Sequence, residues 1–341
     1  MIRRFDGFDL TGLNTFGMKV SCRCFVQYDS TADLRDLDFA SLPQPVMHLG
    51  AGSNILFTGD FPGTVLHSGI KDFHIEGSDE DEVLVEVGSG VIFDDFCSWA
   101  ADNGYWGPEN LSGIPGEVGA SAVQNIGAYG VEVCEIISRV RCYDTGTHDD
   151  VVFTPSQCEY AYRDSIFKHA PAKGRYIVTA VLFRLTRTAA PRLSYGHLAE
   201  AVGEGELTPL RLREAVLRTR DGKLPDPAVT GSAGSYFKNP VVSQELFQHI
   251  CGVASAEKMG EVPHFPAGEG LVKVPAAWMI DKCGLKGLAR GGAAVYDRQP
   301  LVIVNASGEA SPQDVLDVEK AVRDAVQERF GVSLSPEVEH V

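Results

Sequence analysis

Two serines stand among small residues in the stretch GSAGSYFKNP, which runs from Gly231 to Pro240. Small neighbours leave the Ser235 hydroxyl exposed, which is typical of a nucleophile. A nucleophilic serine needs a nearby base, but no histidine lies within a dozen residues of Ser235 and the stretch lacks the G-x-S-x-G pattern. The sequence therefore leaves open what chemistry this hydroxyl performs.

A glycine loop in HLGAGSNILF follows an apolar run and could hold phosphate. Gly50 and Gly52 allow successive backbone N–H groups to converge, and Ser53 and Asn54 add polar side chains. The loop is not a dinucleotide-binding fingerprint, because Ile55 stands where a third glycine is needed. A tight turn without a ligand explains this loop equally well.

A second glycine loop, GIPGEVGASAVQNIGAYG, covers residues 113–130. Gly113, Gly116 and Gly119 recur every three residues, and amide and hydroxyl side chains follow them. A plain strand connection remains an alternative. Two such loops in one chain nevertheless favour a large cofactor that carries phosphate.

The elements that must position these residues alternate between strand and helix patterns. Strand patterns occupy 83–91, 137–144 and 176–185, and helix patterns occupy 93–107, 207–220, 242–252, 273–284 and 311–331. The last helix is the clearest, with Ser311 as its cap, Pro312 in its first turn and Gly331 as its end. We interpret it as a packing element without chemistry. The irregular order predicts α+β domains.

Composition narrows the class of protein. A chain of 341 residues suits two or three domains, and its net charge of −16 argues against coating nucleic acid. No apolar leader and no apolar run of about 18 residues occurs, so we expect a cytoplasmic protein without a membrane span. Eight cysteines without a C-x-x-C pair predict free buried thiols and no metal site.

Five segments carry a family resemblance when they are taken together and in order. They are HLGAGSNILF, GIPGEVGASAVQNIGAYG, YRDSIFK (162–168), GSAGSYFKNP and LSPEV (334–338). In this order and at these separations the chain resembles the UDP-N-acetylenolpyruvoylglucosamine reductase (MurB) family of flavoenzymes from Asn14 to Val338. LSYGHL (193–198) and KLPDP (223–227) resemble the type that carries an extra tyrosine loop.

The resemblance implies a two-domain vanillyl-alcohol-oxidase/PCMH-like FAD-binding fold plus a third α+β substrate-binding domain. The implied boundaries are 1–71 and 72–223 for the FAD-binding subdomains and 224–331 for the substrate domain, with 332–341 packing near the first. It also implies non-covalent FAD, NADPH as co-substrate, a UDP-N-acetylglucosamine enolpyruvate substrate and a monomer. The activity would supply UDP-N-acetylmuramate for peptidoglycan synthesis.

Reduction of an enol ether conjugated to a carboxylate needs a hydride at C3, stabilisation of the carboxylate and a proton at C2. The resemblance assigns the carboxylate to Arg163, whose guanidinium offers paired donors, and to Glu337. Two ionised carboxylates would repel each other, so we expect Glu337 to be protonated there. Ser235 then becomes the proton donor to C2, which explains why it needs no neighbouring histidine.

Further contacts follow from the resemblance position by position. Residues implied to bind FAD are Gly50, Ala51, Gly52, Ser53, Asn54, Ile114, Pro115, Gly116, Gly119, Ala120, Ser121, Gln124, Asn125, Gly127, Tyr129 and Arg220. Residues implied to bind the UDP-sugar are Tyr195, Lys223, Asn239, Lys273 and Gln299.

The chain departs from the family pattern at two places. Phe265 stands where the family often has a tyrosine, and Glu339 and His340 follow PEV where the family often has arginine and apolar residues.

Two other functions remain as alternatives. One is an FAD oxidase or dehydrogenase of the same fold that tethers its flavin through a histidine, for which His48 is near the first loop but lacks a flanking pattern. The other is a non-catalytic UDP-sugar-binding protein, against which the intact set of Arg163, Ser235 and Glu337 argues.

Overall fold

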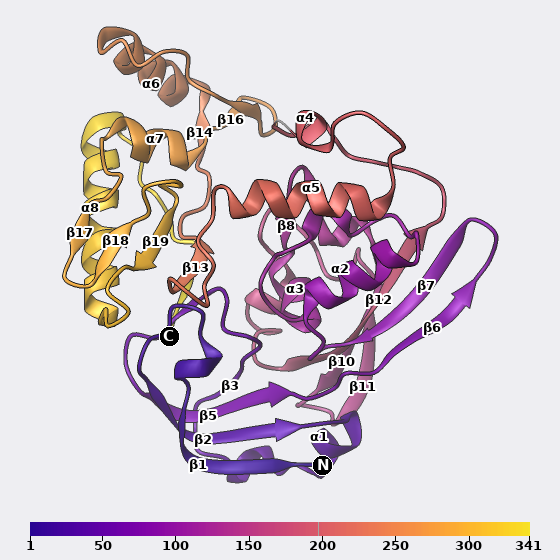
Figure 1. Ribbon diagram of the computed structural model, residues 1–341. Coiled ribbons are helices and arrows are strands. Elements are labelled where there is room, and N and C mark those ends of the chain that lie inside the picture. Colours follow the sequence, from indigo (N-terminus) through magenta and orange to yellow (C-terminus); the bar gives the residue numbers. More distant parts are fainter. Residues whose placement is uncertain (197) are drawn as a thin grey trace. The chain divides into compact units, whose positions relative to one another are not determined.

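The computed structural model describes residues 1–196 and 198–341 (Figure 1). The chain divides into two compact units, each built from separate stretches. Unit 1 comprises 1–8, 21–51 and 61–222, and unit 2 comprises 9–20, 52–60 and 223–341. The three-domain division implied by the resemblance stays a prediction.

The first sheet of unit 1 combines strands from the first seventy residues. Its order is β1 (Arg3–Asp9), β2 (Ser21–Tyr28), β5 (Phe61–Ser68) and β3 (Val46–His48). The β2–β5 and β3–β5 pairs are parallel. Side chains such as Cys24, Val26 and Leu66 are buried in its core, and α1 (Thr31–Asp36) contacts β2.

The second sheet of unit 1 is antiparallel and carries helices. Its order is β11 (Asp149–Phe153), β10 (Ile137–Asp144), β12 (Tyr176–Thr186), β7 (Glu82–Gly88) and β6 (Phe73–Ser78). The three predicted strands are confirmed as β7, β10 and β12. A core of aromatic and branched residues, including Phe96 and Phe183 stacked at 4.3 Å, fills the space between this sheet and the helices.

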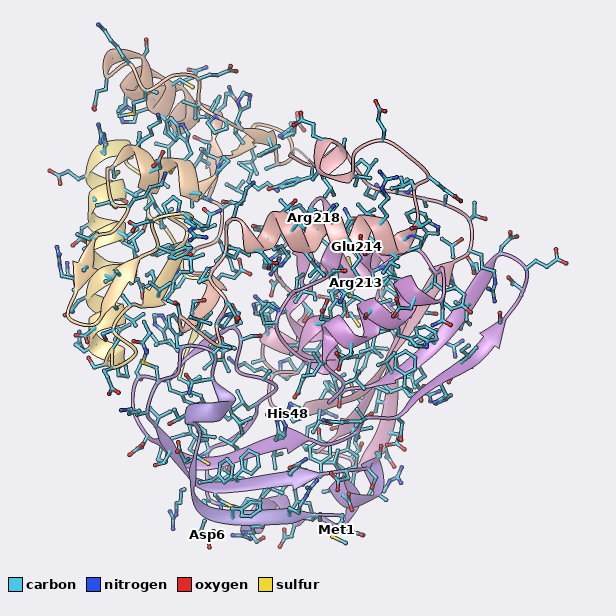
Figure 2. All side chains as sticks on the ribbon, viewed as in Figure 1. Met1, Asp6, His48, Arg213, Glu214 and Arg218 are labelled. Atoms are coloured by element: carbon cyan, nitrogen blue, oxygen red, sulfur yellow. The ribbon has the colours of Figure 1, made fainter. Side chains whose placement is uncertain are left out.

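Three helices gather on one side of this sheet (Figure 1). They are α2 (Phe93–Asp102), α3 (Val118–Gln124) and α5 (Pro209–Asp221), with the short α4 (Leu198–Val202) against α5. The ion pair of Arg213 on α5 with both carboxylate oxygens of Asp94 on α2 joins two of them, and Figure 2 labels Arg213. The predicted helices at 93–107 and 207–220 are confirmed, and Gly104 follows α2 with a φ of 74°.

Unit 2 contains a four-stranded sheet covered by a long helix. The sheet order is β13 (Ser232–Ser235), β19 (Val302–Asn305), β18 (Ala293–Val295) and β17 (Ala289–Arg290), and α8 (Pro312–Phe330) contacts β17, β18 and β19. The predicted helices at 242–252 and 273–284 correspond to α6 (Gln244–Ala256) and α7 (Ala276–Lys282).

Smaller strands complete the two units. In unit 2, β14 (Val241–Ser243), β16 (Leu271–Lys273) and β15 (Phe265–Pro266) form a small sheet, and β4 (Ile55–Leu56) pairs in parallel with β20 (Glu339–His340). In unit 1, β8 (Gly127–Ala128) pairs with β9 (Val131–Glu132).

Helix α8 begins and ends as its sequence predicts. The Ser311 side chain accepts from the N–H of Asp314, whose own side chain completes the capping box, and Gly331 ends the helix with a φ of 71°. Val315, Val318, Val322 and Val326 are buried. The buried face also contains Glu319, a charged residue that the packing interpretation did not anticipate.

All eight cysteines are free and five of them are buried, so the prediction of free thiols is confirmed. Among the described residues, no helix is both long and apolar enough to cross a membrane.

Substitution of Ser311 by alanine removes the side-chain acceptor at the start of α8. We expect the free energy of unfolding to fall by about 1 kcal/mol, as is usual for loss of a helix cap. Chemical denaturation of Ser311→Ala beside Ser333→Ala, a control at an exposed serine, measures the change. Equal stability of the two variants would contradict this account.

Candidate functional site

The two predicted glycine loops meet within unit 1. A Cβ placed on Gly50 would stand 3.2 Å from Glu117 Oε2 and 3.3 Å from the Cβ of Ala120. Gly50 belongs to the first loop, whereas Glu117 and Ala120 belong to the second, at the start of α3. A side chain at this position would crowd both neighbours, and the close approach brings predicted FAD-binding residues of both loops together.

The first loop continues into unit 2 at Gly52. This glycine has a φ of 62°, and a Cβ on it would stand 2.1 Å from the carbonyl oxygen of Leu13. Its backbone carbonyl also accepts from the N–H of Thr15 at 3.2 Å. Gly52 therefore has a packing reason to be glycine in addition to its predicted contact with FAD.

A buried carboxyl lies beside Gly50. The Glu117 residue is 6% exposed, and its Oε1 lies 3.7 Å from Nε2 of His67. Burial raises the pKa of Glu117 to about 8, although Lys71 acts in the opposite direction. His67 hydrogen-bonds through Nδ1 to the carbonyl oxygen of Leu49 at 2.9 Å, and burial lowers its pKa. Both side chains are therefore mainly neutral at pH 7.

The end of the second loop is held in an unusual backbone conformation. Asn125 has a φ of 49°, is fully buried, and donates through Nδ2 to Ala161 O at 2.8 Å and to Glu132 Oε2 at 3.1 Å. Its Oδ1 accepts from the N–H of Cys134 at 3.2 Å. The side chain thus shapes the loop through the protein itself, and its predicted role toward FAD stays a prediction.

Arg163, predicted to be catalytic, is anchored to this same loop. Its guanidinium donates to the carbonyl oxygens of Gly127 and of Asn125, the latter at 3.4 Å, and lies 3.7 Å from the Glu132 carboxylate. Arg163 also has a φ of 55°, in a turn closed by two backbone hydrogen bonds between Ala161 and Asp164. Such strained positions in non-glycine residues concentrate at functional sites.

Lys168 contacts two of the predicted site residues, although the sequence reasoning did not assign it to the site. Its Nζ donates to Oε1 of Gln124 at 2.6 Å and to the carbonyl oxygen of Arg163 at 3.0 Å. It therefore connects a predicted FAD-binding residue to a predicted catalytic one. Its position at the end of YRDSIFK was the available signal.

Arg220 supplies a cation to which no hydrogen bond or ion pair is found among the described residues. It lies on α5 beside Gly113, and its pKa is lowered by burial while Tyr129 and Asp94 act in the opposite direction. Across residues 1–196 and 198–341, no hydrogen bond or ion pair to its guanidinium is found. A partly buried cation without a protein partner, beside the second glycine loop, fits an anionic cofactor such as FAD.

The other two predicted catalytic residues lie together in unit 2. Ser235 ends β13, opposite Val302 of β19. Tyr236 follows Ser235, and its carbonyl oxygen accepts a hydrogen bond from the N–H of Glu337 at 2.8 Å. Phe237 and Pro336 form a further antiparallel bridge, so the tail that carries Glu337 runs beside the strand that carries Ser235. Arg163 belongs to unit 1, and its action at the same site stays a prediction.

Asn54, predicted to contact FAD, also holds this tail. Its Nδ2 donates to the carbonyl oxygen of Glu337 at 3.1 Å, and its own carbonyl oxygen accepts from the N–H of Glu339 at 3.0 Å. The first glycine loop is thus connected to the Glu337 segment within unit 2.

The predicted substrate-binding residues lie in three places. Tyr195, 51% exposed, packs edge-on against Tyr129 at 6.2 Å in unit 1. In unit 2, Oδ1 of Asn239 accepts from the N–H of Ala276 at 3.0 Å, and Lys273 ends β16. The remaining two, Lys223 and Gln299, lie in loops of unit 2.

Phe265, the departure from the family pattern, pairs with Lys273 across β15 and β16 and is 45% exposed.

His48 lies at the end of β3, next to the first loop (Figure 2). Its Nε2 lies 2.7 Å from the hydroxyl of Tyr28. That ring nitrogen is occupied by a protein partner.

Sequence reasoning missed a polar cluster behind Ser235. Tyr236, Glu319 and His340 hydrogen-bond to one another in unit 2. The only signal was a glutamate on the apolar face of the 311–331 helix.

Comparisons with known proteins agree along the whole chain. A family model of the UDP-N-acetylenolpyruvoylglucosamine reductase C-terminal domain matches residues 226–341, and an FAD binding domain model matches residues 23–147. A UDP-N-acetylenolpyruvoylglucosamine reductase from Bacteroides fragilis is 43% identical over 336 residues, which is 98% of this chain and 99% of that protein. One from Chromobacterium violaceum is 44% identical and covers 96% of each.

A solved structure is similar as well. The crystal structure of the UDP-N-acetylenolpyruvylglucosamine reductase from Thermus caldophilus aligns with a TM-score of 0.68 at 25% identity, over 100% of this chain and 98% of that one. With the FAD binding domain match, this likeness confirms the predicted two-domain FAD-binding fold of mixed α and β structure. The tyrosine-loop type stays a prediction.

Glu117 should make stability depend on pH. Because its folded pKa of about 8 lies above its ordinary value of 4.5, the unfolded chain releases this proton first as pH rises. The contribution of the Glu117 carboxyl to the free energy of unfolding therefore decreases as pH rises from about 4.5 to about 8. We expect Glu117→Gln to gain stability relative to the original chain across that window, by up to about 5 kcal/mol, since the two pKa values differ by about 3.5 units and one pKa unit is about 1.4 kcal/mol.

Urea unfolding of the flavin-free chain at pH 5 and pH 8.5 measures this difference. Glu80→Gln, at an exposed glutamate, is the control and should follow the original chain at both pH values. Parallel pH dependence of Glu117→Gln and the original chain would show that the Glu117 carboxyl ionises normally.

Proposed function

Because the chain belongs to the UDP-N-acetylenolpyruvoylglucosamine reductase family, we propose that it reduces UDP-N-acetylglucosamine enolpyruvate to UDP-N-acetylmuramate for peptidoglycan synthesis. It is an FAD-dependent oxidoreductase, with NADPH as the reductant. The observation that carries the proposal is 43% identity over 98% of the chain with a relative of that name.

The reaction adds two hydrogens across a carbon–carbon double bond. When bound, FAD would supply the hydride, and NADPH, oxidised to NADP⁺, would be the reductant that provides it. The hydride forms a new bond at C3, and the π electrons move toward C2 and the adjacent carboxylate. A proton then forms the second bond at C2. The protein has to hold the carboxylate, stabilise the added charge and deliver the proton.

Arg163 is the residue proposed to stabilise the charge. Its guanidinium is partly buried and fixed by the carbonyl oxygens of Asn125 and Gly127, so little reorganisation is needed when negative charge develops. Lys168 supports the same turn by donating to the carbonyl oxygen of Arg163. We propose that Glu337, protonated, donates a second hydrogen bond to the substrate carboxylate.

Ser235 is the residue proposed to protonate C2. Its O–H bond breaks, the bonding electrons remain on the serine oxygen, and the proton joins C2. A weakly acidic hydroxyl suffices because the enediolate formed after hydride addition is strongly basic. The hydrogen bond between the Glu337 N–H and the Tyr236 carbonyl oxygen supports a shared role, because it keeps the two segments adjacent.

For the cofactor, we propose that backbone groups of both glycine loops and the Arg220 cation hold FAD without a covalent bond. The unpaired Arg220 and the neutral state of Glu117 both suit an anionic ligand. The engagement of His48 Nε2 with Tyr28 supports non-covalent binding. For the substrate, we propose contacts from Tyr195, Lys223, Asn239, Lys273 and Gln299.

We also propose that the protein acts in the cytoplasm as a monomer. The substrates are small soluble nucleotides, and no nucleic-acid or membrane partner is needed for the chemistry.

An anaerobic experiment in two steps tests the function. NADPH should bleach the absorbance of the bound flavin, and UDP-N-acetylglucosamine enolpyruvate should then restore it. Failure of the enolpyruvyl compound to restore colour would overturn the proposal. Acid denaturation should release the flavin, whereas colour retained on the protein would favour an oxidase with tethered flavin.

Ser235→Ala should separate these two steps. Bleaching by NADPH should be nearly unchanged, and restoration should slow by about 10²- to 10⁴-fold, because a positioned proton donor contributes that much. Stopped-flow absorbance measures both rates, with Ser232→Ala in the same strand as the control. Equal slowing of both steps would instead make Ser235 a residue that positions the flavin.

A further inference from the structure

A buried polar cluster lies directly behind the Ser235 strand. Tyr236 is fully buried, and its hydroxyl donates to Oε2 of Glu319 at 2.9 Å. The same hydroxyl lies 2.9 Å from Nε2 of His340, which is itself 3.2 Å from Oε2 of Glu319. We define the tyrosine clamp as Tyr236, Glu319 and His340. It joins the residue after Ser235, helix α8 and the tail after Glu337.

The negative charge on Glu319 determines how strongly the clamp holds its hydrogen-bond donors. Burial raises the pKa of this carboxyl, but hydrogen bonds from His340 and Tyr236 act in the opposite direction and leave the pKa below its ordinary value. Arg323 adds a further donor to Oε1 at 3.2 Å. Glu319 is therefore ionised at pH 7, and a buried carboxylate holds its donors tightly because each lost partner leaves part of the charge unsatisfied.

The protons in the clamp can be assigned from chemistry. Burial and the Glu319 carboxylate raise the pKa of Tyr236, so its hydroxyl keeps its single proton and gives it to Glu319. Nε2 of His340 lies 2.9 Å from the tyrosine oxygen and 3.2 Å from Oε2 of Glu319, so a hydrogen on Nε2 faces both of these acceptors. The histidine can therefore donate to Glu319 as well as to the tyrosine.

The clamp acts on both proposed catalytic residues of unit 2 through the backbone. Tyr236 follows Ser235 in sequence, and its carbonyl oxygen accepts from the N–H of Glu337. The N–H of Lys238 donates to Ser335 O at 3.0 Å, which continues the pairing on the other side. His340 fixes the same tail beyond Glu337. The Tyr236 side chain is thus tied to both segments and to α8 at once.

We propose that Tyr236, Glu319 and His340 are positioning residues that set Ser235 relative to Glu337 for the protonation of the substrate. The proposal rests on the proposed reductase function. Tyr236 is the first residue after β13, and its hydroxyl bonds to Glu319 and His340 rather than to Ser235, so the clamp acts on Ser235 through the backbone and not by passing protons. Its effect is geometric, and misplacement of a reacting group by about 1 Å can cost about 10²-fold in rate.

Tyr236→Phe tests the proposal because it removes one hydroxyl and keeps the ring that fills the core. We expect bleaching of the flavin by NADPH to stay within about twofold and restoration at saturating enolpyruvyl substrate to slow by about 10- to 100-fold. The substrate concentration at half-maximal rate should change less than about threefold, because the clamp does not bind substrate.

Tyr143→Phe is the matched control. Tyr143 is also fully buried, and its hydroxyl bonds to Nδ1 of His148 at 2.9 Å in unit 1. The Tyr143→Phe substitution should leave the rates of both flavin steps, bleaching and restoration, unchanged. His340→Gln is a second variant, because its side chain is 31% exposed and the substitution leaves the core intact. If Tyr236→Phe does not fold, His340→Gln decides the question with the same two rates.

Unchanged restoration in a folded Tyr236→Phe or His340→Gln would overturn the proposal, as would equal slowing of both steps. A combined Tyr236→Phe and Glu319→Gln variant should be little slower than Tyr236→Phe alone, because residues that act as one unit are not additive. If the double variant instead slowed restoration by the product of the factors measured for Tyr236→Phe and Glu319→Gln separately, that result would also contradict the proposal. If the original protein itself gives no restoration, the reductase function fails instead, so the two failures are distinguishable.

Discussion

The hydrogen bond from the Glu337 N–H to the Tyr236 carbonyl oxygen is the constraint on which unit 2 depends. It joins two segments that are distant in sequence, and the neighbouring pairs at Phe237 and Lys238 extend it into a short antiparallel ladder. A backbone bond of this kind fixes distance and direction, so it sets where the two side chains can meet a substrate. The buried Glu319 carboxylate reinforces it from behind, because a charge without its donors would be costly there.

In unit 1 the predicted site residues are held in place by close packing between the two glycine loops. Gly50 lies so close to Glu117 and Ala120 that a larger residue would crowd their side chains. The same loop ends at Asn125, whose carbonyl oxygen receives the Arg163 guanidinium. The loops that suit FAD and the arginine assigned to the substrate are therefore parts of one packed structure, supported by Lys168.

Sequence patterns predicted many of the helices and strands, because these elements are determined by residues close together in the chain. Ser311 and Gly331 determine where α8 begins and ends through bonds to their own neighbours, and strand alternation was enough for β7. The short helix α3 was missed because glycine and alanine give no apolar period. The role of Glu319 depends on Tyr236 and His340, which only tertiary structure brings to it, so its position on an apolar helix face looked like a packing exception. The family resemblance supplied the site residues, but it carried no information about what holds them.

The pairing of β4 with β20 has a consequence for the order of synthesis. Residues 52–60 leave the ribosome early, yet Ile55 and Leu56 pair with Glu339 and His340, which are made much later. Residues 9–20 likewise belong to unit 2, whose longest stretch begins at Lys223. Domains generally fold as units during translation, so the Asn54 loop must wait for the tail before its backbone is fully paired. Residues 52–60 are therefore a part of unit 2 that a nascent chain leaves incompletely paired until Glu339 and His340 have been made.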